Sequence, residues 1–257
     1  MSRFLAIYQR ELSYFYNSTV AYVVITIFVL LGGYFFYSLV AVFNMVSIQM
    51  MQNPTGGPSL SVTEIILQPL YKDNLSIVML LIMPLLTMRL LSEERKSGTA
   101  ELLFTYPISD WDAILGKYFA TLTVFLSMLA ITAVFPLLLT RYVSLEWGPV
   151  LSNYLGLTLL GMAFVAMGLF FSSLSDNQLV AGILTFGCAL LFLIIGWVQP
   201  FVSADVAAVV TQLSILEHFD SFSRGIIDSN DIVYYLNFSV LFLFLCSRVL
   251  ESNRWRG

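Results

Sequence analysis

The sequence is poor in charge, in histidine and in cysteine. Asp, Glu, Lys and Arg make up 11% of the 257 residues, and there are one histidine and two cysteines. Two cysteines do not form a disulfide framework, and a lone histidine without nearby thiols does not form a zinc centre. Because a basic stripe is also absent, we do not expect nucleic-acid binding.

Apolar residues take the place of the missing polar ones, at 58% of the chain and a mean hydropathy of +0.85. Several runs approach the roughly 20 residues that cross a bilayer as a helix. We therefore expect an all-α, polytopic membrane protein in which residues 1–257 form one transmembrane domain. Polar clusters and Gly/Pro positions bound six expected transmembrane helices, at residues 20–43, 75–91, 113–140, 151–174, 179–202 and 232–250.

The Lys and Arg residues are distributed unevenly between the two sides of these spans. Lys72, Arg141 and Arg224 lie on one side, and all the others lie on the side of the two termini. Cytoplasmic loops of membrane proteins carry the excess of positive charge. The pattern predicts that both termini are cytoplasmic, and an even number of spans agrees with this.

The N-terminal segment, residues 1–19, has the spacing of an amphipathic helix. Phe4, Tyr8, Leu12 and Phe15 share one helical face, and polar side chains occupy the opposite face. A helix with this pattern lies in the plane of the membrane interface. We expect it to precede the first span on the cytoplasmic side.

A second amphipathic segment, residues 205–231, precedes the last span on the outer side. Its apolar face holds Ile215, Phe219, Phe222 and Ile226. We expect it to rest on the outer leaflet or to dip into it as a re-entrant segment. Asp220 and Arg224 have the i,i+4 spacing of an ion pair on this helix.

Residues 92–112 interrupt the apolar pattern with a charged cluster and several helix signals. Gly98 is expected to end the helix that leaves the second span, because glycine adopts the left-handed conformation readily. Thr99 is a good N-cap for a new helix, and Pro107 stops that helix after one or two turns. Ser109, with an acidic residue three positions later, predicts a capping box for the next span. The segment therefore predicts a short helix held between two stems.

The machinery for nucleotide hydrolysis is missing. Gly116 and Lys117 are followed by Tyr118, where a P-loop requires Ser or Thr. The six spans contain no Asp or Glu that could relay protons or support catalysis in the membrane. If ATP drives this protein, another chain binds it.

Small residues in the fourth span allow close approach of a neighbouring helix. They could either pack against helices of the same chain or line a pore. We favour packing for this set, which comprises Gly161, Ala163, Ala166 and Gly168.

Three stretches carry a family resemblance that extends over essentially the whole chain. They are EERKSGTAELLFTYPISDWDAILGKYFA from residue 93, SSLSDNQLVAG from residue 172, and LSILEHFDSFSRGIIDSNDIVYYL from residue 213. The first resembles the cytoplasmic loop between the second and third helices of ABC transporter permeases of the type-2 export family. The last is similar to the gliding-motility-like branch of these permeases. The resemblance implies an N-terminal elbow helix, a cytoplasmic coupling helix that docks into a separate ATPase, and a location in the bacterial inner membrane.

The resemblance also implies site residues and partners. The ATPase-coupling residues would be Glu93, Glu94, Gly98, Thr99, Glu101 and Leu102, and Arg3, Arg10 and Glu11 would belong to the elbow interface. An outer gate or docking site would involve Glu217, His218, Phe219, Phe222 and Arg224. The expected partners are ABC ATPase subunits that bind ATP and Mg²⁺, a second permease copy or paralogue, an accessory membrane subunit with a large extracytoplasmic domain, and lipid. This chain itself is expected to hold no catalytic residue, metal or cofactor.

Two other classes of function compete with an ATP-driven exporter or mechanical machine. An ATP-independent scaffold or assembly protein could use the same cytoplasmic loop as a platform. A membrane-embedded enzyme is disfavoured by the lack of clustered His, Cys or intramembrane Asp and Glu. Copurification with an ATPase would distinguish an ATP-driven exporter or machine from the scaffold and from the enzyme.

Overall fold

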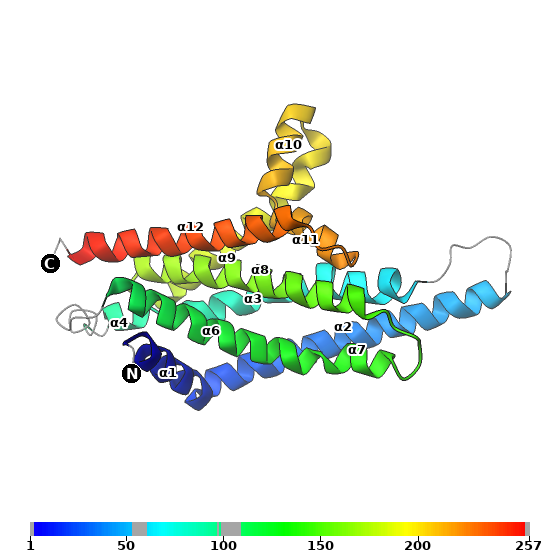
Figure 1. Cartoon of the computed structure of the whole chain (residues 1–257), viewed down its shortest axis with the longest axis horizontal. Coiled ribbons are helices and arrows are strands. Elements are labelled where there is room, and N and C mark those ends of the chain that lie inside the picture. Colours follow the sequence, from blue (N-terminus) through cyan, green and yellow to red (C-terminus); the bar gives the residue numbers. More distant parts are fainter. Residues whose placement is uncertain (1–2, 53–60, 97, 99–108, 255–257) are drawn as a thin grey trace.

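The computed structural model describes residues 3–52, 61–96, 98 and 109–254, and every regular element in these ranges is helical (Figure 1). The N- and C-terminal helices end at the same side of an elongated bundle, which we call the terminal end. The elements are α1 Arg3–Asn17, α2 Thr19–Gln52, η1 Thr63–Leu67, η2 Pro69–Leu75, α3 Ser76–Thr87, α4 Ser92–Lys96, α6 Asp110–Thr132, α7 Val134–Leu139, α8 Trp147–Leu174, α9 Gln178–Ile194, η3 Ile195–Phe201, α10 Ala204–Leu213, α11 Ile215–Ser223 and α12 Ser229–Arg254.

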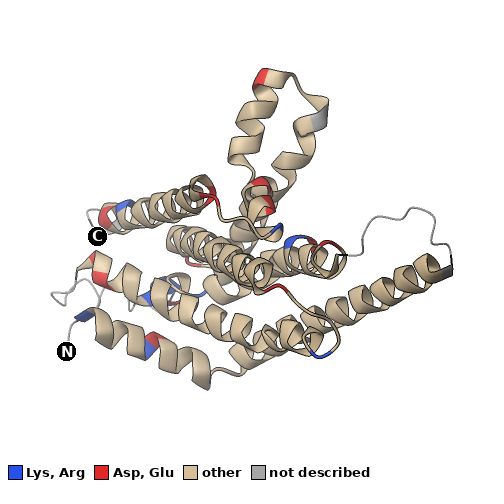
Figure 2. Cartoon of the chain, turned by 45° about the vertical axis from the view of Figure 1, so that its right-hand side comes forward, with Lys and Arg blue, Asp and Glu red and all other residues tan. Residues whose placement is uncertain are grey.

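Six helical stretches in the described part of the chain are long and apolar enough to cross a membrane. Figure 2 shows that charged residues are sparse along them, and α2 carries none at all. The prediction of an all-α, polytopic membrane protein is therefore confirmed. The stretches are Thr19–Met51, Thr63–Lys96, Asp110–Leu139, Trp147–Leu174, Gln178–Gln199 and Ser229–Ser252.

The first two spans are longer than the sequence pattern indicated. The first helix continues from the expected end at residue 43 to Gln52, because a single polar residue, Asn44, does not stop a helix in an apolar run. The second begins near Thr63 with two π-helical segments that lead directly into α3. Pro69 opens the second of these segments, where its missing N–H costs little.

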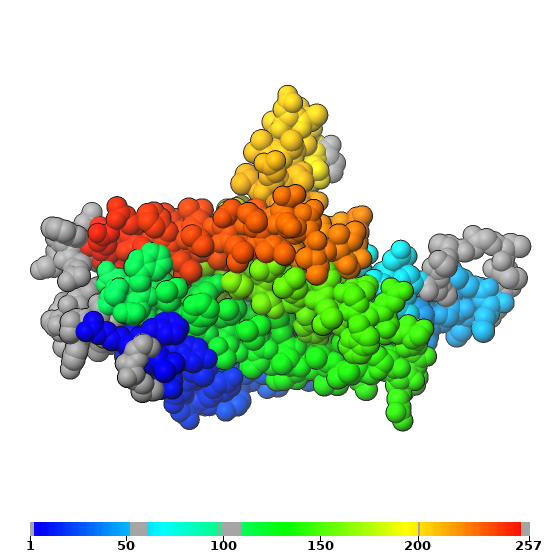
Figure 3. Space-filling model, viewed as in Figure 1, coloured from blue at the N-terminus to red at the C-terminus, as the bar shows by residue number. Residues whose placement is uncertain are grey.

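The fifth span departs from its expected course to residue 202. Its α-helix ends at Ile194, and a 3-10 helix, η3, follows to Phe201. The chain then reverses into α10, and these two short helices stand out from the side of the bundle (Figures 1 and 3). Gly196 fits at this bend because an added Cβ would lie only 2.6 Å from the hydroxyl oxygen of Ser214.

Helix α8 forms the centre of the bundle and packs against α3, α6, α9, α11 and α12. A Cβ added at Gly161 would lie 2.1 Å from a ring carbon of Phe125. A Cβ added at Gly168 would lie 2.0 Å from the hydroxyl oxygen of Thr87. Ala163 and Ala166 are completely buried. The expectation that these small residues pack within the chain is confirmed, since each glycine gives a neighbouring helix room to approach.

Candidate functional site

The N-terminal helix α1 lies along the first half of α6 at the terminal end. Gly116 permits this contact, because a Cβ there would lie 2.8 Å from the Ile7 side chain. The Tyr8 hydroxyl is 3.0 Å from that of Thr123. The amphipathic helix expected from the sequence is therefore packed on the third span, and its most buried residues are Ile7, Glu11 and Phe15.

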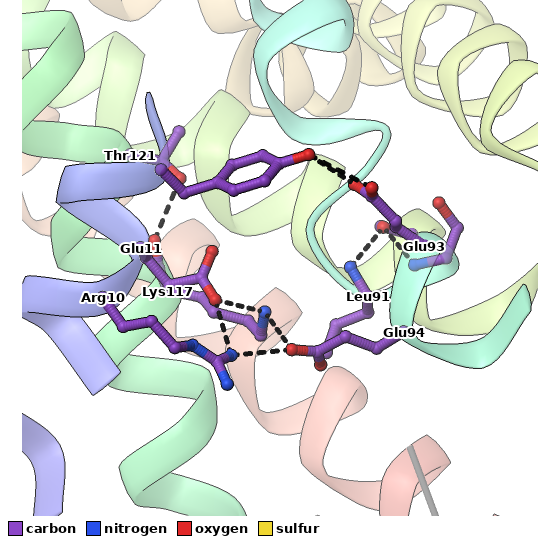
Figure 4. Close-up of polar contacts among 10 residues, drawn as sticks. Arg10, Glu11, Leu91, Glu93, Glu94, Lys117 and Thr121 are labelled. Atoms are coloured by element: carbon purple, nitrogen blue, oxygen red, sulfur yellow. Dashed lines mark hydrogen bonds and ion pairs between the residues drawn. The ribbon is translucent and has the colours of Figure 1, made fainter. Parts of the chain in front are cut away.

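A cluster of four charged side chains joins α1, α4 and α6 (Figure 4). The Lys117 ammonium lies 2.9 Å from a carboxylate oxygen of Glu11 and 2.9 Å from one of Glu94. The Arg10 guanidinium contacts the same two oxygens, at 2.8 Å and 2.9 Å. Each carboxylate thus faces two cations. Lys117 of α6 bridges Glu11 of α1 and Glu94 of α4, and Arg10 bridges its neighbour Glu11 and Glu94. We call this set the four-charge cluster.

The environment keeps this cluster ionised. The Lys117 side chain is only 2% exposed, so its charge would be costly without partners. Burial alone would raise the pKa of Glu11, but the charge of Lys117 and the hydrogen bonds from Arg10 and Lys117 outweigh it and lower that pKa. Burial alone would lower the pKa of Arg10, but the hydrogen bonds and charges of the two carboxylates outweigh it and raise that pKa. The opposite charges therefore hold each other in place.

A second set of contacts ties the elbow helix to the stem of the second span. The Tyr14 hydroxyl donates to a Glu93 carboxylate oxygen at 3.1 Å. The Arg89 guanidinium lies over the rings of Tyr14 and Phe15, 4.5 Å and 4.6 Å from their centroids, a favourable cation–π arrangement. Glu93 is thus connected to α1, as Glu94 is to α6.

The other side of the stem is bound to the end of α8. Between α3 and α4 the helix is interrupted, and the freed N–H groups of Leu91 and Ser92 donate to the Ser172 hydroxyl at 2.9 Å and 3.1 Å. That hydroxyl donates in turn to the Met88 carbonyl at 3.0 Å. Arg95 pairs with Asp176 at 2.6 Å, just after α8. The stem α4 is therefore fixed to spans three and four and to the elbow helix.

Gly98 has the backbone conformation expected from the sequence. Its φ is +69°, and its N–H donates to the Arg95 carbonyl at 3.2 Å. The predicted left-handed end of this helix is confirmed. The predicted capping box at Ser109 is wrong, because Ser109 precedes α6 in an extended conformation but its side chain makes no capping hydrogen bond. Thr99, Glu101, Leu102 and the expected coupling helix itself lie outside the described residues.

A cavity of about 340 Å³ opens between these elements at the terminal end. It is lined by both signs of charge and by one tyrosine, which gives it no preference for an anion or a cation. In the described ranges, no three His, Cys, Asp or Glu side chains gather into a set that could hold a metal. The lining comprises Arg10, Glu11, Tyr14, Arg89, Leu90, Glu93, Glu94 and Lys117.

Among the expected site residues, the structure brings Glu93, Glu94, Arg10 and Glu11 together. Arg3 begins α1 and is not part of the four-charge cluster. The sequence pattern did not indicate Lys117 as a site residue or Ser172 as a support for the stem. Lys117 was visible as a cation within an otherwise apolar span, and both residues lie in stretches that carry the family resemblance, but neither stretch indicated these contacts.

The expected outer site divides into buried and exposed members. Phe219 and Phe222 are fully buried against Gly156 of α8, where an added Cβ would lie 2.8 Å from each of them. They attach α11 to the bundle in this structure. Arg224 forms the predicted pair with Asp220 at 2.7 Å, and Asp220 also binds Lys72 of η2. A partner role for Glu217, His218 and Arg224 remains a prediction.

Comparison with known families decides which protein class this bundle represents. A family model described as "ABC-2 family transporter protein" matches residues 48–245, which is more than half of the chain. The chain belongs to the ABC-2 transporter family. As an ABC-2 permease it is a membrane transport component, and its membership implies association with ABC ATPase subunits. No curated protein sequence matches this permease.

The matched region of the permease begins within α2 and ends within α12. It therefore includes the stem α4 and Lys117 but not the elbow helix α1. The contacts of Arg10 and Glu11 come from the structure alone. Six apolar helices and the family together fit a multi-pass membrane protein.

Proposed function

We propose that this permease is the membrane subunit of an ATP-driven transporter, working as an exporter or as a mechanical machine across the inner membrane. A separate ABC ATPase subunit binds ATP and Mg²⁺ and docks on the segment between α4 and α6 on the cytoplasmic side. The observation that carries the proposal is the position of buried Lys117 between Glu11 and Glu94. It joins the two helices that flank the docking segment, α4 and α6, to each other and to the elbow helix.

A push on this segment reaches the membrane through α4 and α6. Lys117 and Glu94 join these two helices, and Ser172 and Asp176 join α4 to the end of α8. A displacement of the stem therefore moves spans two, three and four as packed elements, which is the shear type of domain motion. The regular α-helix is interrupted after Thr87, and Gly98 adopts the left-handed conformation.

A second permease copy or a paralogue completes the transport path in this proposal. Among the six spans, α2 is the least buried within the chain, followed by α9, whereas α3 and α8 are the most buried. The exposed faces of α2 and α9 are therefore available to lipid and to the second permease. Membership of the gliding-motility-like branch, and an accessory subunit with a large extracytoplasmic domain, rest on the segment from residue 213.

Composition of the native complex tests this function. The full chain is purified from its own membranes with a mild detergent, and the copurifying subunits and their nucleotide hydrolysis are measured. We expect an ABC ATPase at a fixed ratio to the permease, with hydrolysis that stops when Mg²⁺ is removed. A stable complex without any nucleotide-binding subunit would contradict the proposal and favour the ATP-independent scaffold.

A further inference from the structure

The only histidine of the chain connects three helices at the end of the bundle opposite the termini. His218 lies on α11, and its Nδ1 is 2.7 Å from a carboxylate oxygen of Asp231, in the first turn of α12. Its Nε2 is 3.2 Å from the backbone carbonyl of Gln212, in the last turn of α10. Its ring stacks on Tyr234 with the centroids 3.8 Å apart. The imidazole therefore has an acceptor at each nitrogen and an aromatic face beside it.

Only the doubly protonated imidazole satisfies both of these acceptors. A neutral ring has one N–H and one lone pair, so one of its nitrogens would direct a lone pair at an oxygen. Three groups that attract a cation face the ring: the Asp231 carboxylate, the C-terminal end of α10 and the face of the Tyr234 ring. The second carboxylate oxygen of Asp231 is buried without a hydrogen-bond partner. His218 is therefore the side-chain partner that the structure gives to the Asp231 carboxylate.

Other charged groups near His218 are engaged elsewhere or lie at a distance along their helices. On α11, Asp220 binds Lys72 and Arg224, and Glu217 lies beside Gly196 of η3. Before α12, an Asp228 oxygen accepts from the Asn230 N–H at 2.9 Å. The one charged residue of α10, Asp205, is in its first turn, and α8, α9 and η3 have none.

The end of α10 has one further tie to α12. The Tyr234 hydroxyl donates to the Leu213 carbonyl at 2.9 Å. Apart from this end, α10 packs mainly on η3, and the two helices project from the bundle (Figure 3). The contacts of His218 and Tyr234 therefore decide how firmly the projecting pair is attached to the last span.

We propose that His218 is a proton-operated latch that attaches the projecting helices η3 and α10 to the last span. When the ring is doubly protonated, Nδ1–H donates to Asp231 and Nε2–H donates to Gln212. When the ring loses one proton, Nδ1 keeps its proton because Nδ1–H donates to the Asp231 carboxylate. Nε2 then directs a lone pair at the Gln212 carbonyl. The bond to α10 is then lost, and the end of α10 is held less firmly as the pH of that compartment rises. This latch is independent of the proposed ATPase partner.

Nitrogen NMR tests the protonation state directly, because the chain has a single histidine. The full chain, carrying a histidine-free tag, is labelled with ¹⁵N-histidine and placed in lipid nanodiscs. At about pH 5 both ring nitrogens should be protonated, and at about pH 8 Nε2 alone should have lost its proton. A neutral ring at about pH 5, or a neutral form protonated on Nε2, would overturn the proposal.

Two carboxylate variants separate the latch from a general effect of charge. Asp231→Asn should decrease the doubly protonated fraction at intermediate pH, and Asp228→Asn, a nearby matched change outside the latch, should leave it unchanged. Equal effects of both variants would contradict the assigned pair.

Hydrogen exchange tests the release itself, with His218→Gln as the reference at each pH. The opening of residues 204–213 in the unmodified chain should be roughly tenfold less frequent than in the variant at about pH 5. The two proteins should converge at about pH 8. A difference that does not change with pH, or no difference at either pH, would overturn the latch.

Discussion

The Lys117 ammonium lies 2.9 Å from the Glu94 carboxylate and thereby joins the start of the third span to the stem that leaves the second. Glu11 of the elbow helix contacts the same ammonium at the same distance. Three segments that are separate in the sequence thus meet on one buried cation. Their mutual position depends on that charge, which makes it the first target for mutation.

Lys117→Met should destabilise the folded chain, because Glu11 and Glu94 would both lose a buried cation. Breaking a buried ion pair costs on the order of 3 kcal/mol. Unfolding in nanodiscs, followed by heat or denaturant, measures the difference. Lys96→Met, at the exposed end of α4, is the matched control and should have little effect. Equal stability of the Lys117 variant and the original chain would show that the cluster contributes nothing.

Acid should weaken the attachment of the elbow helix. The pKa of Glu11 is below its ordinary value of 4.5, so the unfolded chain binds more protons than the folded one near that pH. The contribution of Glu11 to the free energy of unfolding is therefore complete above pH 4.5, and it is lost as the pH falls through the lower pKa that Glu11 has in the folded chain. Unfolding measured across this range should show the loss, and Glu11→Gln should reduce it. Glu251→Gln, which alters an exposed pair on α12, should retain the full pH dependence.

Gly98→Val should impair coupling without preventing membrane insertion. An added Cβ would have no neighbour within 4 Å, but a φ of +69° strains any β-branched residue, by about 1–2 kcal/mol. ATP hydrolysis by the assembled complex and membrane insertion are the two measurements. Gly98→Asn, which tolerates this conformation, should remain close to normal. Gly148→Val, at another open position without positive φ, controls for side-chain size. Normal hydrolysis in Gly98→Val would refute the role of the turn.

Gly161→Ala should disturb the centre of the bundle. The new methyl group would lie 2.1 Å from Phe125, so α6 and α8 would have to separate, at a cost of about 1–3 kcal/mol. The thermal stability of the purified chain should fall. Gly187→Ala adds the same group at a site with no neighbour within 4 Å and should be neutral. Similar stability of the two variants would contradict the packing role.

The sequence was sufficient for the features that depend on local chemistry. Apolar runs predicted six helices long and apolar enough to cross a membrane, and the helical spacing of apolar residues predicted an amphipathic helix at the N-terminus. The glycine at position 98 predicted the left-handed backbone there. Helix ends were less predictable. The first span was expected to end at residue 43 and the second to begin at residue 75, although an apolar helix accommodates one polar residue, Asn44, and π-helical turns accommodate Pro69.

The partners of the candidate site could not be predicted, because they depend on how distant segments pack. Lys117 is 106 residues from Glu11 and 23 from Glu94. Ser172 supports Leu91 across 81 residues. Neither spacing has a local pattern that would reveal the contact. In the sequence alone, Lys117 indicates only topology, and Ser172 resembles any serine at a helix end.

The central claim is that a separate ATPase drives the membrane domain through the unit held by Lys117. The most direct measurement is the rate of ATP hydrolysis per assembled complex in nanodiscs, for the original permease, Lys117→Met and Lys72→Met. Lys72 is a matched control, since it pairs with Asp220 on the far side of the membrane domain. We predict that Lys117→Met lowers the rate by roughly tenfold or more, in complexes of normal composition, and that Lys72→Met does not. Hydrolysis by the Lys117→Met complex at the original rate would contradict the account.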